Sequence, residues 1–411
     1  DFNYVWYSGK LWRITAIYPD GTMKMITDDV ITAISYGEDV NFYTDENNKS
    51  WVYQWLNEDF LSTLYNYKNI IVTDASWNAT NSNEADVSTK LPETTMVTAP
   101  VGLLNSYEYY KSYQNVSNSN GYLNIGYYWW LLNPYSSSAI WSVYILGDGY
   151  EFTNNAHGVR PVITMQSGTM ISGGSGTSNN PYAILGDKES ITPNTTLLNT
   201  RTSGEYVNFD DELYRIVEID DNTTKLNKVD FIRDENGKVI EKIFQENLTY
   251  GNGTSNEYWD YYLNNAWYSE INELYKSMLV KKIFYLGNVN RESGNNYKTS
   301  ICVSINNNVT IAECEKTTST WTGYVGLPRY GEMFASQQHQ NNSFPSSNMW
   351  LITPYYSLSI VWYIANIGYG TGSDRLPATD TISVRPSITL NSNVKIAGGT
   401  GLKNDPFEIS L

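Results

Sequence analysis

The sequence predicts an α+β protein built from two tandem copies of one domain, and two observations support this prediction. Trp-Trp-Leu-Leu-Asn-Pro-Tyr at residues 129–135, closed by Val-Arg-Pro-Val-Ile at 159–163, recurs as Met-Trp-Leu-Ile-Thr-Pro-Tyr at 349–355, closed by Val-Arg-Pro-Ser-Ile at 384–388. Short strand patterns and two helical patterns follow the same order in each half, as in mixed-sheet domains. We expect a first domain at residues 1–187, a linker at 188–204 and a second domain at 205–411.

The first residues of the chain predict a three-stranded meander. Residues 4–14 have strand composition around a turn at Ser8-Gly9, and Pro19-Asp20-Gly21 marks a second turn before residues 23–26. Turn residues between runs of β-branched and aromatic residues are typical of antiparallel strands.

Two helices follow in the first half. Apolar residues at 52, 55, 56, 60, 61 and 64 fit one helical face. Residues 74–96 are polar without clear periodicity, so we expect a long surface loop. Residues 101–109 predict a short strand that turns into a helix capped by Ser106.

The half ends with a turn at residues 173–177 and a short strand at 180–184. Its apolar pattern resembles that of an early strand of the same half, so we expect the two to pair and to close the domain. Residues 188–204 carry Pro193 and many Thr, Asn and Ser, which is typical of a linker. The alternative for part of this segment is packing against one of the domains.

The second half repeats this order. Residues 206–216 match 4–14, the Leu-Asn pair at 263–264 falls on 56–57, and Val-Gly-Leu at 325–327 matches 101–103. The repeat is nearly two hundred residues long, which indicates a duplicated domain and not an array of short solenoid repeats.

An insertion in the second half carries both cysteines of the chain. Alternating β-branched and polar residues flank an Asn-rich turn between Cys302 and Cys314, which predicts a hairpin with both thiols near its open end. We expect a disulfide and therefore an oxidising compartment; the alternative is two buried free thiols.

Composition narrows the function classes. The 411 residues include 35 Tyr and 13 Trp but only 27 Lys and Arg, and the net charge is −16. This charge repels a phosphate backbone, so nucleic acid is a poor partner. No apolar run is long enough to span a membrane, so we expect no membrane insertion by this segment. The chain begins at Asp1 without Met, which we interpret as a mature ectodomain or an excised fragment whose anchor or export signal lies outside it.

Two residue pairs of the recurring frame have structural interpretations. We expect Trp130 and Trp350 to be core anchors rather than a sugar-stacking platform. We expect Arg160 and Arg385 to donate hydrogen bonds to carbonyls or a buried acid; a ligand role is the alternative. The proline that follows each arginine removes a ladder donor, which favours a strand edge or a bulge.

The ordered motifs resemble a known group of domains. Six motifs occur in the same order in both halves. They are Leu-Trp/Tyr-Arg-Ile, Leu-Asn with a tryptophan four or five positions before the leucine, Val-Gly-Leu, Trp-Leu-x-x-Pro, Val-Arg-Pro-x-Ile and Gly-Gly-x-Gly-x-x-x-Asn/Asp-Pro-Tyr/Phe. Together they are similar to bacterial extracellular domains with a C-type-lectin-like fold, relatives of formylglycine-generating-enzyme-like domains and of the variable proteins of diversity-generating retroelements. The cysteine hairpin resembles domains carried on Firmicutes surface and pilin-like proteins.

The resemblance implies a loop-rich face that presents variable residues on a rigid scaffold. Tyrosine, tryptophan and asparagine suit such a face because they give contact area and directional hydrogen bonds at low entropic cost. The implied ligand-binding residues are Tyr135, Trp141, Tyr144, Asp148, Tyr150, Asn154 and Asn155 in the first half and Tyr355, Tyr356, Trp362, Tyr363, Asn366, Tyr369 and Asp374 in the second.

Departures from the group argue against two of its activities. Calcium-dependent sugar sites need a Glu-Pro-Asn or Gln-Pro-Asp triplet and a Trp-Asn-Asp, and Trp77-Asn78-Ala79 lacks the acid. Oxidase relatives need a reactive cysteine pair, whereas the only pair here lies in the predicted hairpin. The two histidines, His157 and His339, occupy non-matching positions, so we expect no shared histidine-based site, no metal site and no cofactor.

We therefore expect a non-catalytic recognition or adhesion protein at the extracellular bacterial cell surface. Its partner would be a protein or glycan on another cell or surface. An alternative is a structural subunit of a pilus, filament or surface layer that contacts neighbouring copies of itself. A carbohydrate-active enzyme is a further alternative, since paired carboxylates are compatible with the many Asp and Glu residues.

Overall fold

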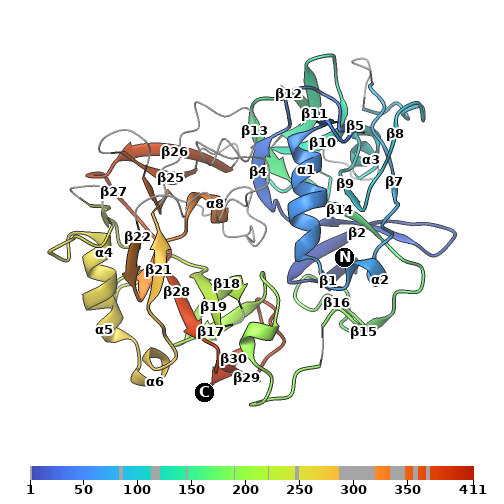
Figure 1. The fold of residues 1–411 in the computed structure, drawn as a ribbon. Coiled ribbons are helices and arrows are strands. Elements are labelled where there is room, and N and C mark those ends of the chain that lie inside the picture. Colours follow the sequence, from blue (N-terminus) through green and yellow to red (C-terminus); the bar gives the residue numbers. More distant parts are fainter. Residues whose placement is uncertain are drawn as a thin grey trace. The chain divides into compact units, whose positions relative to one another are not determined.

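The computed structural model describes residues 2–82, 87–112, 121–144, 147–188, 190–220, 222–245, 250–286, 320–333, 348–354, 360–366 and 371–411. Mixed sheets dominate, with 41% of the chain in strands and 14% in helices, so the predicted α+β class is confirmed. Two compact units make up the chain (Figure 1). The first contains the described residues through Lys188, and the second those from Ser190 onward, apart from Thr371. None of the described helices combines the length and apolar character needed to cross a membrane.

Two sheets form the first unit. The larger has the order β15 (Ile171–Gly173), β16 (Tyr182–Ile184), β1 (Tyr4–Tyr7), β2 (Lys10–Ile17), β3 (Met23–Thr27), β14 (Val162–Met165) and β9 (Val101–Gly102). The smaller has the order β12 (Gly147–Phe152), β11 (Ala139–Tyr144), β10 (Trp129–Pro134), β13 (Ala156–Val159) and β4 (Thr32–Ser35).

Short helices and ladders complete the first unit (Figure 1). Helix α1 (Trp51–Gln54) continues as the π-helical η1 (Trp55–Asp59) and the 3-10 helix η2 (Phe60–Thr63), as the helical pattern at 51–64 predicts. The remaining elements are α2 (Tyr67–Ile70), α3 (Ser106–Lys111), the ladder β5 (Tyr43–Asp45) with β6 (Asn48–Lys49), and the ladder β7 (Ser76–Asn78) with β8 (Met96–Thr98).

The predicted meander and the predicted closure of the unit are both confirmed. Strands β1, β2 and β3 pair antiparallel in sequence order. Strand β16 then pairs parallel to β1, with Val5 opposite Tyr182. This closure requires a sharp turn before β16, where Gly174 has φ +84° and a Cβ would lie 1.8 Å from the Pro181 carbonyl oxygen. Only glycine fits that position.

Two predictions for the middle of the first unit are wrong in detail. Asn105, not Ser106, is the N-cap of α3, because its side chain accepts the Glu108 N–H while Glu108 bonds back to the Asn105 N–H. Residues 74–96 are not a featureless surface loop, since β7 and the start of β8 lie there and Trp77 is buried. A single large aromatic residue inside a polar segment anchors it to the core without creating a periodic pattern.

Arg160 and Pro161 form the corner at which the chain passes from one sheet of the first unit to the other. Arg160 is fully buried and donates hydrogen bonds to the carbonyl oxygens of Thr27 (3.0 and 2.8 Å), Leu123 (2.6 Å) and Asp28 (3.0 Å), so its predicted structural role is confirmed. Pro161 lies between β13 and β14, where no ladder donor is lost.

The second unit has a main sheet of order β17 (Tyr206–Phe209), β18 (Glu212–Asp220), β19 (Thr223–Lys228), β28 (Ser387–Asn391) and β23 (Val325–Gly326), beside the three-stranded sheet β24 (Met349–Pro354), β25 (Ile360–Asn366) and β26 (Thr371–Pro377). Two-stranded ladders are β20 (Lys242–Ile243) with β27 (Thr381–Ile382), β21 (Lys282–Tyr285) with β22 (Thr320–Gly323), and β29 (Lys395–Gly398) with β30 (Glu408–Ser410). Its helices are α4 (Trp259–Tyr262), π-helical η4 (Leu263–Trp267), α5 (Tyr268–Glu270), α6 (Glu273–Lys276) and α8 (Tyr330–Met333), and 3-10 helix η3 (Leu198–Thr200) precedes β17.

Several connections occur in both units. The order β17-β18-β19-β28-β23 repeats β1-β2-β3-β14-β9. Asn57 donates to the Val101 carbonyl (3.0 Å) and accepts the Val101 N–H (3.0 Å), and Asn264 makes the same two bonds to Val325 (2.8 and 3.1 Å).

The matching tryptophans of the two units are equally buried. Trp130 and Trp350 are both fully buried, as expected of core anchors. Each lies in a strand whose pairing is interrupted by a register shift before the proline, at Pro134 and at Pro354.

The predicted linker at 188–204 belongs largely to the second unit. Leu198 is 1% exposed within that unit's core, and Leu197 bridges to Lys395. Packing of part of the linker against a domain was among the expected arrangements, but one buried leucine among polar residues has no periodicity that would identify it.

Candidate functional site

The candidate site of the first unit lies on the hairpin of β11 and β12. Its two strands are in continuous register from Ala139 opposite Phe152 to Tyr144 opposite Gly147, and β12 is the last strand of its sheet. Trp141 lies directly opposite Tyr150, so their side chains share one face of the hairpin. Strand β10, anchored by the buried Trp130, lies on the other side of β11.

Three aromatic rings, from Tyr135, Tyr150 and Trp141, contact one another at this hairpin. The Tyr135 and Tyr150 rings are parallel, with centroids 4.0 Å apart and planes 4° apart. The Trp141 ring meets Tyr135 edge-on at 4.9 Å and 89°. Trp141 is buried and donates from Nε1 to the Ser82 hydroxyl (2.6 Å), whereas Tyr150 is 49% exposed. The stack therefore holds an exposed tyrosine in a fixed orientation on a buried tryptophan.

Glu151 fixes the polar side of the hairpin. It accepts a hydrogen bond from the Asn155 amide (2.8 Å). The single hydroxyl proton of Tyr144 lies between two acceptors, Glu151 (3.1 Å) and the Tyr150 carbonyl oxygen (2.8 Å). Burial raises the pKa of Glu151, but hydrogen bonds, including that from the Phe152 N–H, outweigh burial and lower it overall. Glu151 is therefore an anion at neutral pH and orders the surrounding side chains.

His157 is buried against the hairpin. Its ring stacks on Trp130 (4.5 Å, 24°) and contacts the Tyr128 and Tyr144 rings, and its Nε2 lies 3.9 Å from Glu151. Burial lowers the pKa of His157 to about 4, against the attraction of Glu151. The imidazole is neutral at physiological pH and acts as a packing group.

The seven predicted residues of the first half lie on β11 and β12 or in the segments next to these strands. Asp148, Tyr150, Asn154 and Asn155 are exposed, Tyr135 and Tyr144 are half-buried, and Trp141 is buried. The carbonyl of Asn154 accepts a hydrogen bond from the Ser35 hydroxyl (2.9 Å), which ties the loop after β12 to β4.

Fewer of the predicted residues of the second half can be placed. Tyr355, Tyr356 and Tyr369 lie outside the described residues, as do His339, Cys302 and Cys314 with their predicted disulfide. Asn366 ends β25, and Asp374 lies on β26. Trp362 is 1% and Tyr363 is 8% exposed.

Trp141, Trp362 and Tyr363 therefore do not lie on an exposed binding face, contrary to expectation. Trp362 packs on Tyr330 with centroids 4.8 Å apart, and Tyr363 lies opposite the core Trp350. Large aromatic residues of a strand gain most by burial, so they form the base of the hairpin rather than its surface.

The sequence interpretation missed two residues of this site. Phe152 is 55% exposed and follows Tyr150 by two positions on the same strand, so both side chains project from one face of β12. Glu151 lies between them and organises the polar contacts. The alternation of aromatic and acidic residues at Tyr150, Glu151 and Phe152 could have indicated that both aromatic side chains lie on one face of a strand.

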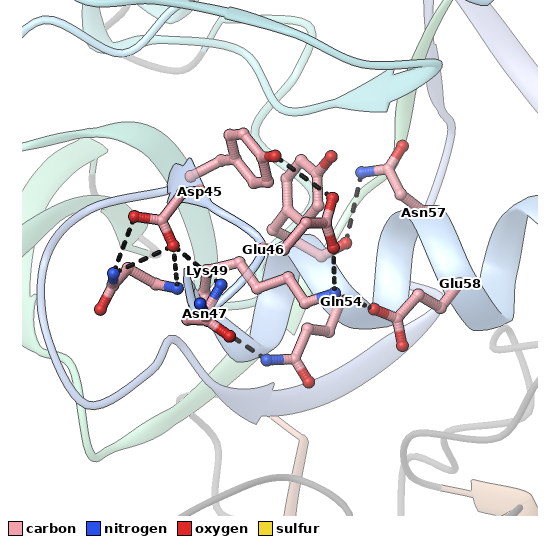
Figure 2. Close-up of polar contacts among 10 residues, drawn as sticks. Asp45, Glu46, Asn47, Lys49, Gln54, Asn57 and Glu58 are labelled. Atoms are coloured by element: carbon pink, nitrogen blue, oxygen red, sulfur yellow. Dashed lines mark hydrogen bonds and ion pairs between the residues drawn. The ribbon is translucent and has the colours of Figure 1, made fainter. Parts of the chain in front are cut away.

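A second polar cluster of the first unit lies between the β5–β6 ladder and α1 (Figure 2). Asp45 accepts hydrogen bonds from the backbone N–H groups of Asn47 (2.8 Å) and Asn48 (3.1 Å), and Lys49 pairs with Glu46 (3.2 Å) and Glu58 (2.6 Å). These bonds close a turn and tether it to the helix, which is a structural role. Among the described residues, no three His, Cys, Asp or Glu side chains gather as a metal site.

Comparison with known proteins gives no match. No protein family, no curated protein and no solved structure is significantly similar to this chain.

Proposed function

We propose that this chain is a non-catalytic extracellular recognition protein that binds a protein or glycan through the aromatic hairpin of β11 and β12. The observation that carries the proposal is the ordered stack of Tyr135 on Tyr150 above the buried Trp141. A tyrosine held in one orientation loses little entropy when a ligand covers it, so its contact area contributes fully to affinity.

The exposed chemistry of the hairpin supports a recognition role. Tyr150 and Phe152 give apolar area, and Asp148, Asn154 and Asn155 add polar groups around it. An aromatic centre with a polar rim is the usual anatomy of a protein-binding surface, and exposed tyrosine rings also stack on sugars.

We propose further that the two units are copies of one domain with a C-type-lectin-like fold, on a protein of the bacterial cell surface. The shared strand order, the matching asparagine bonds and the buried Trp130 and Trp350 support a duplication. The lectin-like assignment rests on the ordered sequence motifs, and the surface location rests on them and on the predicted Cys302–Cys314 disulfide.

A second candidate function is self-assembly into a pilus, filament or surface layer. One observation favours it: β12, with Tyr150 and Phe152 exposed, is the last of the described strands of its sheet. Such an edge can pair with a strand of a neighbouring copy. In this case the aromatic hairpin is the contact between copies.

Binding of the full chain to glycan and protein arrays tests the first function, with Tyr150→Ala and Phe152→Ala as variants and Tyr18→Ala as a matched control. Tyr18 is also exposed but lies just after β2. Recognition predicts a specific array signal that the two hairpin variants weaken and the control keeps. An unchanged signal in both hairpin variants rules out this face. Sedimentation and electron microscopy of the same samples test the second function, which requires ordered polymers that the hairpin variants prevent.

A further inference from the structure

The second unit contains a pocket that the proposed recognition face does not include. It has a volume of about 270 Å³. Its lining includes the charged residues Glu218, Asp220, Lys225, Lys282 and Arg329, next to Phe284. A pocket of this size is just below the usual range of drug-sized ligand sites, about 300–1,000 Å³, and suits a smaller ligand.

A buried carboxylate fixes two cations at the inner end of this pocket. Glu332 is almost fully buried and pairs with the Lys225 ammonium and with Arg329 Nε (3.0 Å). Burial raises the pKa of Glu332, but Lys225 and Arg329 outweigh burial and lower it to about 2. The carboxylate therefore stays charged and holds both cations in one geometry.

The outer part of the pocket carries both signs of charge. Lys282 pairs with Asp220 at 3.1 Å, and Arg329 Nη2 lies 4.0 Å from Glu218. The side chains of Lys282 (38%), Asp220 (46%) and Glu218 (38%) are partly exposed. Anionic and cationic groups therefore alternate around the opening.

The first unit shows that Glu218 is not required to build this part of the fold. Lys225 lies opposite Glu218 just after a register shift between β18 and β19. At the same shift between β2 and β3, Lys24 lies opposite Ala16. Lys24 makes the corresponding ion pair, to Glu108. The lysine–glutamate pair thus occurs in both units, but the additional carboxylate occurs only at the pocket.

Arg329 is also an addition to the shared arrangement. Its backbone N–H donates to Glu332 (2.9 Å), as the N–H of Asn105 donates to Glu108 (3.0 Å). Asparagine supplies a neutral helix cap at this position in the first unit, whereas arginine supplies a cation at the pocket of the second. A cation is therefore not needed to cap this helix, and the arginine of the second unit adds a positive charge that pairs with Glu332 beside the pocket.

We propose that this pocket binds a small zwitterion of amino-acid size, with its carboxylate toward Arg329 and Lys282 and its ammonium toward Glu218 and Asp220. A simple anion would be repelled by the two acids and a simple cation by the three basic groups, whereas a zwitterion complements both. Phe284 and the neighbouring Ile283, which is 53% exposed, provide apolar surface for the ligand's side chain.

Calorimetric titration of the full chain with phenylalanine tests this proposal. Two blocked forms, N-acetylphenylalanine and phenylalanine amide, each keep one of the two charges. Since a charged hydrogen-bonded pair is lost in each case, both should bind at least tenfold more weakly than the free amino acid. Equal affinity of either blocked form overturns the proposal, and so does the absence of binding by free amino acids at millimolar concentrations.

Phenylalanine binding by substituted chains tests whether this pocket is the binding site. Glu218→Gln and Lys282→Met should each weaken binding of phenylalanine about tenfold or more. Glu212→Gln is the matched control, because Glu212 is on the same strand but pairs with Lys228 at 2.8 Å outside the pocket. Unchanged affinity in both pocket variants, or an equal loss in the control, contradicts the assignment. Equally strong binding of a neutral hexose would show that charge is not recognised and would also overturn it.

Discussion

Tyr135 lies flat on Tyr150, with their ring centroids 4.0 Å apart, and joins an exposed strand edge to the buried Trp141. The two tyrosines are fifteen positions apart in the sequence: Tyr135 follows β10, and Tyr150 lies within β12. Their contact makes the exposed ring part of the scaffold rather than a free side chain, and the predicted effects of mutation differ for the two partners.

Replacing Tyr150 should affect binding more than stability. Tyr150→Ala removes exposed contact area and should lower affinity for an array-identified ligand at least tenfold, while the loss of the stack costs about 1 kcal/mol of unfolding free energy. Tyr135→Ala should lower affinity indirectly by freeing Tyr150. Affinity and the urea midpoint, measured on the same preparations, distinguish the two effects, and full affinity in both variants would contradict the proposed face.

Acid should destabilise the first unit through His157. The pKa of His157 in the folded protein is about 4, below its usual 6.5, because burial disfavours the cation. The unfolded chain binds the proton first, so stability is complete above pH 6.5 and falls as the pH decreases to 4, by up to about 3 kcal/mol. Denaturation midpoints across this range measure the loss. His157→Phe should remove it; an unchanged pH profile in this variant would show that another group is responsible.

Glu332 should matter more to stability than its counterpart Glu108. Glu332→Gln leaves Lys225 and Arg329 buried without their anion, which should cost about 3–5 kcal/mol. Glu108 is more exposed (28% against 6% for the side chain), so Glu108→Gln should cost less. Chemical denaturation of both variants measures the difference. Equal losses would mean that burial does not set the strength of these pairs.

Leu198 should anchor the start of the second unit. It is 1% exposed in that core, so Leu198→Ala should cost about 2–5 kcal/mol. Ile191→Ala is a control, because Ile191 is only partly buried against the same core. A second unit produced from residue 205 should be less stable than one produced from residue 190. If thermal unfolding gave equal stability for both, residues 190–204 would be a linker as the sequence suggested.

The aromatic hairpin was predicted as a region but not residue by residue. Composition indicated that the span between Trp130 and Arg160 is rich in recognition residues, and the structure brings these residues together. Composition could not indicate that Trp141 and Trp362 face inward, because tryptophan serves equally well as a core anchor and as a surface contact. The pocket beside Lys282 could not be predicted, since β18, β19 and β21 meet there only through tertiary packing.

Local patterns in the chain were enough to predict the α+β class, the meander that opens the first half and, as the favoured interpretation, a structural role for Arg160. These features depend on local periodicity, on turn residues and on motifs that recur. The folded chain was needed to show which aromatic side chains reach solvent, that Leu198 belongs to the second core, and that Glu332 holds two cations at a pocket. The physical reason is that burial and charge pairing depend on distances between strands remote in sequence, and no local pattern encodes these distances.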